Sequence, residues 1–405
     1  MLVLAAVLLL GGQFVGAQGG GHTLAEPVAP LPAMVQGSAA WTIGEPAFEG
    51  EFPEGMRFSI AASSSAGRIT SARVVWSHAP GNNTRRSRGA SYEETSGRWV
   101  AVWPHDRGDV PPWVLVRYHW ELTDELGNRY ISAERDEIYA DADNAARWHS
   151  AESEDVVVYW IDLPAEFGQQ TIQAMAERRE FFHQAWGGPL PYRPRVILYG
   201  PTALPEYEQA LGRPARIGAG ITTGTTSEDW GGTIQYARLA DSAYGMGYGT
   251  VLHEIAHLYQ GEYAHLPVDW FVEGNAEFFS VARDIDYREW GRQRLLSGDP
   301  LSFAHGFSIR GRTFRDGYQL GATVFEYLVA TYGLDAHRRV WELIGRNVPA
   351  LQAIEQVTGV TIAQFERDWR SWMGVDTPPP TLAPSPTPPF DIYTLPTPTF
   401  VAPGS

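Results

Sequence analysis

Residues 250–279 read TVLHEIAHLYQGEYAHLPVDWFVEGNAEFF and are the most informative stretch of this chain of 405 residues. His253 and His257 stand four positions apart in an otherwise apolar run, which predicts a buried helix with both imidazoles on one face. One turn apart, the two rings can share one zinc ion. Glu254 is rotated away from the pair, where a carboxylate can reach a water on the metal without binding the metal. The run therefore has the His-Glu-x-x-His pattern of a zinc site.

A zinc site with two histidines needs a third protein ligand, and the second half of the stretch offers one. Glu273 follows His257 by sixteen positions. Glu277 comes four residues later, so on a helix it shares a face with Glu273 and can hydrogen-bond a ligand histidine. The alternative is an apolar helix whose histidines are satisfied inside the core. That alternative treats the histidine pattern and the matching downstream glutamates as a coincidence.

These residues resemble the gluzincin zinc metallopeptidases, and most closely the peptidase MA-like family. In that family the third ligand stands in a stretch of Trp, a hydrophobic residue, any residue, Glu, Gly, any residue, Ala, Glu and an aromatic residue. The resemblance extends over residues 152–375. The matching residues are Trp270, Phe271, Glu273, Gly274, Ala276, Glu277 and Phe278.

The resemblance implies a peptidase with one Zn2+ per chain, held by His253, His257 and Glu273. Peptide bonds would be hydrolysed by a zinc-activated water with Glu254 as general base. Glu277 would hydrogen-bond a ligand histidine without binding the metal itself. The expected fold is that of a zincin, with an α/β part followed by helices.

The resemblance also suggests a donor for the oxyanion and a strand for the substrate. Tyr318 stands in the Tyr-x-x-Gly context of the aminopeptidase branch, whereas His305 is the rival donor by analogy with thermolysin. His265 lies between the two expected helices, and we expect it at the surface. The segment GGTIQYARL (231–239) stands where zincins place an edge strand that pairs with an extended peptide.

Composition excludes several other kinds of function. The formal net charge of −16 argues against nucleic acid or an anionic membrane as the main partner. All 31 basic residues are arginine, so no lysine is available as a nucleophile. The absence of cysteine excludes disulfides and thiolate ligands, and any metal must therefore bind to His, Asp or Glu.

The chain reads as a multidomain protein. An apolar segment (1–17) resembles a signal peptide and is followed by a linker (18–37), which predicts a secreted or cell-surface protein with no integral membrane domain beyond that signal or anchor. Alternating strands over 38–143 predict an antiparallel β-sandwich that resembles immunoglobulin or fibronectin type III modules. The peptidase domain would occupy 152–375, and the Pro/Thr-rich residues 376–405 would form a disordered tail.

Two readings of the function remain open at this point. The first is a metallopeptidase acting on a peptide or protein substrate. We expect an endopeptidase, because the Gly-x-Met-x-Asn strand that grips a substrate amine in the aminopeptidase branch has no counterpart in 231–239. The second is a catalytically inactive zincin-like surface protein that binds partners through its β-sandwich. The sequence leaves the oligomeric state open.

Overall fold

The computed structural model describes residues 33–78, 85–104, 110–215, 224–227, 229–298, 301–303, 306–310 and 314–376. The predicted signal peptide, most of the linker, residues 377–405 of the tail and His305 lie outside these residues and stay predictions. The chain forms two compact units. Unit 1 comprises Met1–Ala215 and Thr225–Leu239, and unit 2 comprises Arg216–Gly224 and Ala240–Ser405. The domain intervals inferred from sequence stay predictions about independently folding parts.

The first part of unit 1 is built from antiparallel sheets. One sheet has the order β1-β11-β10-β6-β7, with β12 also paired to β10, and another has the order β3-β4-β9-β8. Strands β2 and β5 form a separate pair. The strands are β1 (Met34–Gln36), β2 (Trp41–Ile43), β3 (Ala47–Glu51), β4 (Gly55–Ile60), β5 (Ala62–Ser64), β6 (Ile69–Ser77), β7 (Arg86–Gly89), β8 (Ser91–Glu93), β9 (Arg98–Pro104), β10 (Val114–Asp124), β11 (Arg129–Ile131) and β12 (Arg135–Tyr139).

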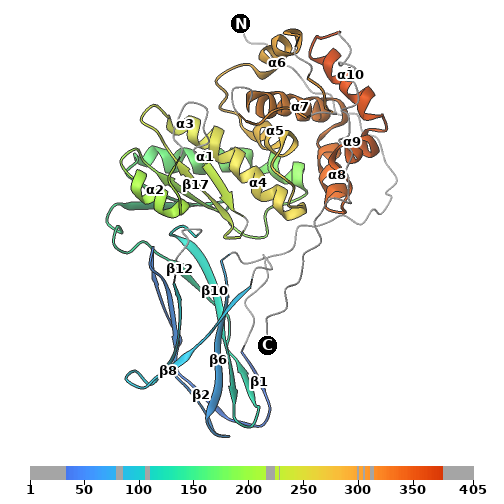
Figure 1. Ribbon diagram of the computed structural model, residues 1–405. Coiled ribbons are helices and arrows are strands. Elements are labelled where there is room, and N and C mark those ends of the chain that lie inside the picture. The colour runs from blue at the N-terminus through green and yellow to red at the C-terminus, as the bar shows by residue number, and fades with distance from the viewer. Residues whose placement is uncertain are drawn as a thin grey trace, which may run out of the picture. The chain divides into compact units, whose positions relative to one another are not determined.

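Strand β10 is the central strand of its sheet and pairs with β6 (Figure 1). Its five alternating apolar residues, Val114 to Leu122, are at most 1% exposed, as the period of two predicts. Phe58 of β4 packs edge-on against Tyr118 of β10 with ring centroids 5.1 Å apart, which joins the inner faces of the two larger sheets. Residues 124–128 form the hairpin connection between β10 and β11. The immunoglobulin-like identity of this β region stays a prediction.

The second part of unit 1 is a five-stranded mixed sheet of order β13-β14-β15-β17-β16. Strands β14 and β15 are parallel and α1 lies between them in sequence, which is the arrangement of the expected α/β part. The expected edge strand at 231–239 is wrong, because β17 pairs with β15 and β16 and is buried along its whole length. Among the described strands, β13 and β16 are the two outer strands of this sheet, and β16 is the one next to β17. The elements are β13 (Trp148–Glu152), β14 (Val157–Ile161), α1 (Ala165–Trp186), β15 (Arg195–Tyr199), α2 (Leu204–Leu211), β16 (Gly224–Ser227) and β17 (Gly232–Tyr236).

Apart from Gly224 of β16, the regular elements in the described part of unit 2 are helices, which confirms the helices expected after the α/β part. Two of its segments, η1 and η3, are π-helical turns that run directly into longer helices. No helix in the described part of the chain is long and apolar enough to cross a membrane. The elements are α3 (Ala243–Gly245), η1 (Met246–Val251), α4 (Leu252–Tyr263), α5 (Trp270–Phe279), α6 (Tyr287–Leu296), η3 (Asp316–Leu320), α7 (Gly321–Tyr332), α8 (Leu334–Ile344), α9 (Ala350–Thr358) and α10 (Ile362–Trp372).

Helices α5 and α7 lie side by side and cross at two glycines (Figure 1). A Cβ added to Gly274 would stand 2.5 Å from the Cα atom of Gly321, so the two backbones touch. Beside this crossing Phe271 packs against Phe325 and Trp341, with ring centroids 5.0 and 5.6 Å away. Close backbone contact and aromatic packing together fix α5 within unit 2.

Candidate metal centre

The helix that carries both histidines, α4, is positioned by its apolar side. Leu252, Ile255 and Leu258 are fully buried, which anchors the helix in unit 2. The π-helical turn η1 precedes it. The carbonyl of Tyr248 in that turn accepts hydrogen bonds from the backbone N–H groups of Val281 and Ala282, at 2.8 and 3.1 Å. The start of the histidine helix is therefore tied to the segment that follows α5.

The helix that carries Glu273, α5, has a well-defined start. Asp269 is its N-cap, and one carboxylate oxygen accepts from the N–H groups of Phe271 and Val272, at 2.9 and 3.2 Å. This arrangement satisfies donors that the first turn of a helix leaves unpaired. Glu273 thus lies in a fixed first turn, with its side chain directed at α4.

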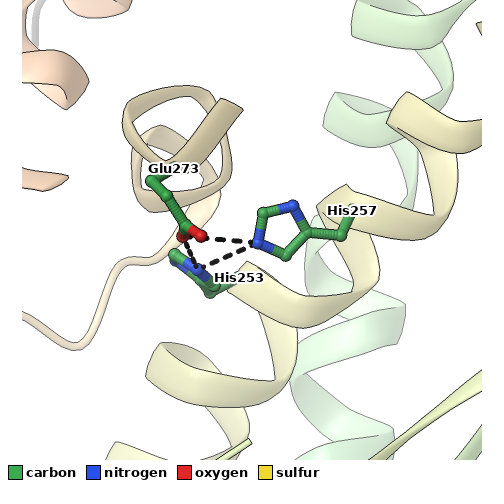
Figure 2. A group of neighbouring side chains, drawn as sticks. All are labelled: His253, His257 and Glu273. Atoms are coloured by element: carbon green, nitrogen blue, oxygen red, sulfur yellow. Dashed lines mark hydrogen bonds and ion pairs between the residues drawn. The ribbon is translucent and has the colours of Figure 1, made fainter. Parts of the chain in front are cut away.

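The structure brings His253, His257 and Glu273 together, as Figure 2 shows. The Nε2 atoms of the two histidines are 3.3 Å apart. An oxygen of Glu273 lies 3.2 Å from Nε2 of His253 and 3.5 Å from Nε2 of His257. A tetrahedral zinc ion with bonds of about 2.0–2.1 Å places its ligand atoms roughly 3.3–3.4 Å from one another. The three donor atoms therefore already have the separation that zinc requires, and two imidazoles with one carboxylate are a normal zinc ligand set.

The other ring nitrogen of each histidine has a partner of its own. Nδ1 of His253 lies 2.9 Å from a carboxylate oxygen of Glu277, and Nδ1 of His257 lies 2.8 Å from Oε1 of Gln260. Tyr287, the first residue of α6, donates its hydroxyl to the other oxygen of Glu277. Partners on Nδ1 leave both Nε2 atoms to face the shared point, which is how metal-binding histidines are oriented.

The charges of the metal-free cluster are strongly coupled. Burial favours neutral His253, but the hydrogen bonds that its ring donates to Glu273 and Glu277 outweigh burial and hold the pKa of His253 well above its ordinary value. Burial also opposes the charge of Glu273, yet the two histidines hold the pKa of its carboxyl well below the usual range. Without metal the pair is therefore an imidazolium and a carboxylate. The raised pKa of His253 contributes stability that is complete below the pKa of an unfolded histidine and is lost as the pH rises through the raised value. The lowered pKa of Glu273 contributes stability that is lost as the pH falls through the lowered value.

The remaining predicted site residues are placed as follows. Glu254 follows His253 on α4 and is 4% exposed. Tyr318 comes from η3, and its ring stacks on that of His253 with centroids 5.7 Å apart and an interplanar angle of 15°. Tyr318 thus lies beside the ligand cluster, Glu254 adjoins the ligand His253 in sequence, and the catalytic roles of both stay predictions. His265 is exposed, as expected.

Sequence reasoning missed several polar residues around the cluster. Gln260 stands three positions after His257, so its place on the same side of an apolar helix was a usable signal. Tyr287, Asn275 and His337 had no such signal, since their neighbours in space come from other helices. Asn275 and His337 are both fully buried and hydrogen-bonded to each other at 2.7 Å.

No protein-family model matches the chain, and no curated protein matches it. Among solved structures, the M1 zinc metallopeptidase from Deinococcus radiodurans matches with 15% identity and a TM-score of 0.33, over 86% of this chain and 96% of that chain. A mutant of that enzyme bound to Tyr-Ser-Ala substrate gives 14% identity and a TM-score of 0.34, over 87% and 97%. A polysaccharide deacetylase from Bacillus cereus gives 11% and 0.19, over 41% and 51%. Identities and TM-scores this low assign the chain to no family, so its function has to be argued from the site.

Proposed function

We propose that this chain is a secreted or cell-surface zinc metallopeptidase that hydrolyses peptide bonds. The observation that carries the proposal is the triangle of donor atoms from His253, His257 and Glu273, with sides of 3.2, 3.3 and 3.5 Å. An ion pair with Glu273 explains why each Nε2 atom faces the carboxylate, but it does not explain why the two Nε2 atoms also lie 3.3 Å from each other, which is the spacing of two ligands of one zinc ion. The hydrogen bonds at both Nδ1 atoms support the same conclusion, because they leave the Nε2 lone pairs available to a metal.

The chemistry divides between the metal and the side chains around it. Zinc held by the three ligands would lower the pKa of a water toward neutrality and polarise the carbonyl of the scissile bond. Glu254 takes the proton from the attacking water and passes it to the leaving amine. Tyr318 donates its hydroxyl to the developing oxyanion of the substrate. Glu277, held by Tyr287, keeps His253 in the orientation that binds the metal.

The substrate class is a peptide or protein, and we propose internal cleavage. The support for internal cleavage comes from the sequence: no Gly-x-Met-x-Asn segment, which holds the substrate amine in the aminopeptidase branch, precedes His253. Cleavage of a library with free and acetylated N-termini tests this directly. An endopeptidase cuts both sets inside the sequence, whereas an aminopeptidase releases single residues from the free set only.

The metal assignment is tested by elemental analysis of the full chain. Wild type should hold one zinc per chain, and His253→Ala and Glu273→Ala should lose it, because two remaining ligands bind zinc weakly. His265→Ala is the matched control, since this histidine is exposed in the connection between α4 and α5. Full zinc content in both ligand variants would refute the ligand assignment.

The catalytic assignment is tested with Glu254→Gln. The amide cannot accept the proton of the water, so the variant should keep zinc and fold while hydrolysis falls by roughly 10²–10⁴-fold. Hydrolysis at the wild-type rate would show that Glu254 is not the base. A wild type that binds zinc and cleaves no peptide would instead favour the inactive surface protein that binds through its β-sandwich.

A further inference from the structure

Gln260 contacts both halves of the zinc cluster. Its Oε1 atom lies 2.8 Å from Nδ1 of His257, on its own helix α4. Its Nε2 atom donates to the backbone carbonyl of Val272 at 2.9 Å, and this residue directly precedes Glu273 on α5. One amide side chain therefore touches a ligand histidine and the backbone beside the ligand glutamate.

The carbonyl of Val272 fixes the direction of these hydrogen bonds. A backbone carbonyl can only accept, so the side of the Gln260 amide that faces it must be the NH2 group. The oxygen of Gln260 then faces His257 and can only accept, so the proton of His257 stands on Nδ1. In the neutral ring, the lone pair then stands on Nε2 and is directed at the metal position. The tautomer of neutral His257 is thus selected by a backbone atom of the other ligand helix.

The same amide continues into a buried chain of polar groups. Nε2 of Gln260 also donates to Oδ1 of Asn275 at 3.0 Å, and Nδ2 of Asn275 reaches Nε2 of His337 at 2.7 Å. Asn275 and His337 are 0% exposed, and the rings of Phe278, Phe279 and Phe325 surround His337. Polar groups so deep in an aromatic core are costly unless every partner is in place, and a satisfied network rigidifies its surroundings. The network links α4, α5 and α8 behind the ligands.

We propose that Gln260 is a positioning residue of the zinc centre, which sets the ring of His257 and holds α4 in register with the start of α5. The inference rests on the zinc site proposed above. The two ligand histidines differ in the group that contacts Nδ1. Nδ1 of His253 contacts the carboxylate of Glu277. Nδ1 of His257 contacts the neutral amide of Gln260, which also hydrogen-bonds to α5.

The test compares zinc binding in the full chain with Gln260→Ala and Gln260→Met. Methionine is close to glutamine in length and leaves little cavity, so it keeps the test open if the alanine variant fails to fold. Ile255→Val is the control, because this residue is buried on the same helix and has no polar role. Zinc affinity is measured by competition with a chelator, and the ligand field by the visible spectrum of the cobalt(II) form. The gain in unfolding free energy on adding zinc separates metal binding from the stability of the metal-free protein.

We expect both Gln260 variants to lose roughly 10–100-fold in zinc affinity, with a changed cobalt spectrum. The stabilisation by zinc should shrink by the equivalent of about 1.4–2.7 kcal/mol. Ile255→Val should keep wild-type affinity and spectrum. Wild-type affinity and spectrum in a folded Gln260 variant would overturn the inference alone. A wild type that binds no zinc would overturn the inference and the proposed function together, and a wild type that binds zinc without cleaving peptides would overturn the function only.

Discussion

The crossing of α5 and α7 makes Gly274→Ala a sensitive test of how the site is held. Gly274 directly follows the ligand Glu273, and its Cβ position lies 2.5 and 2.6 Å from the Cα and C atoms of Gly321. Carbon atoms in contact normally stand about 3.5–4.0 Å apart. The clash is with backbone, which cannot rotate away. The two helices must therefore separate by roughly 1 Å to admit one methyl group.

The free energy follows from two opposing terms. Alanine is favoured over glycine inside a helix by about 1 kcal/mol, while forced overpacking costs about 1–3 kcal/mol. Gly274→Ala should therefore lower the unfolding free energy by about 0–2 kcal/mol. Gly291→Ala on α6 is the matched control. Its Cβ would meet only the ends of two flexible side chains, Met373 at 2.7 Å and Leu320 at 2.9 Å, so this variant should be neutral or stabilised by up to about 1 kcal/mol.

The effect on function should exceed the effect on stability. A shift of about 1 Å in α5 moves the carboxylate of Glu273 away from the two histidines, and a misplacement of this size can cost about 10²-fold in catalysis. We expect kcat/KM to fall by roughly 10–100-fold in Gly274→Ala and by less than about threefold in Gly291→Ala. Zinc affinity should follow the same order.

Denaturant unfolding of the metal-free proteins, chelator competition and peptide turnover measure the three quantities on the same samples. The reasoning is refuted if Gly274→Ala is as stable as Gly291→Ala and also binds zinc like wild type. The crossing of the two helices would then have room for a methyl group. If activity is lost while zinc affinity is unchanged, the substitution has displaced Tyr318 and not Glu273.

Three further changes probe the groups around the ligands. Tyr318→Phe should lower kcat and kcat/KM together by roughly 10²–10³-fold with KM unchanged, since the hydroxyl would contact only the oxyanion. Normal turnover would show that Tyr318 only packs its ring on His253. Tyr287→Phe should weaken zinc less than Glu277→Ala, which removes the direct partner of His253 and should cost about 10–100-fold; the reverse order in a chelator assay would contradict this. Burial opposes the charge of His253 but the carboxylates raise its pKa, so protons compete with zinc. Zinc affinity should therefore rise with pH from the ordinary histidine range up through the raised pKa of His253, and a flat titration would show that His253 releases no proton on binding.

The core of the candidate site could be predicted because it depends on local geometry. The step of four between His253 and His257 places both rings on one helix face in any sequence context. Glu273 and Glu277 are related by the same step on α5, and one faces the metal position while the other backs a histidine. Strands with clear alternation, such as β10, could be predicted for the same reason.

The parts that could not be predicted depend on contacts between distant segments. Strand β16 is a short polar run, GTTS, with the composition of a turn, so 231–239 looked like the outer strand. Strand β13 has the sequence WHSAE, and all of it except Glu152 lies in the interval between the two domains that we inferred from sequence. Tyr287 reaches Glu277 only because α6 folds back onto α5, and no spacing in the sequence encodes that approach.

The position of Tyr318 is another such case, because its turn is held by contacts from elsewhere in unit 2. Asp316 at the start of η3 accepts two hydrogen bonds from Arg294 of α6, at 2.8 and 2.9 Å. The N–H of Gly317 donates to the carbonyl of Ser308 at 2.7 Å, and a Cβ on this glycine would stand 2.8 Å from that oxygen. A π-helical turn is rare and persists where its surroundings fix it, often at functional sites. These contacts supply that constraint one and two residues before Tyr318.

The Tyr-x-x-Gly motif then has two separate structural tasks. Gly321 allows the helix after the turn to approach α5 to backbone contact at Gly274. This approach places Tyr318, three residues earlier, with its ring stacked on that of His253 at an interplanar angle of 15°. A bulkier residue at the glycine position would move the tyrosine away from the ligands without changing either aromatic ring. The short motif thus determines the position of Tyr318 relative to the ligands as well as its chemistry. Loss of the glycine should reduce activity because it displaces the tyrosine.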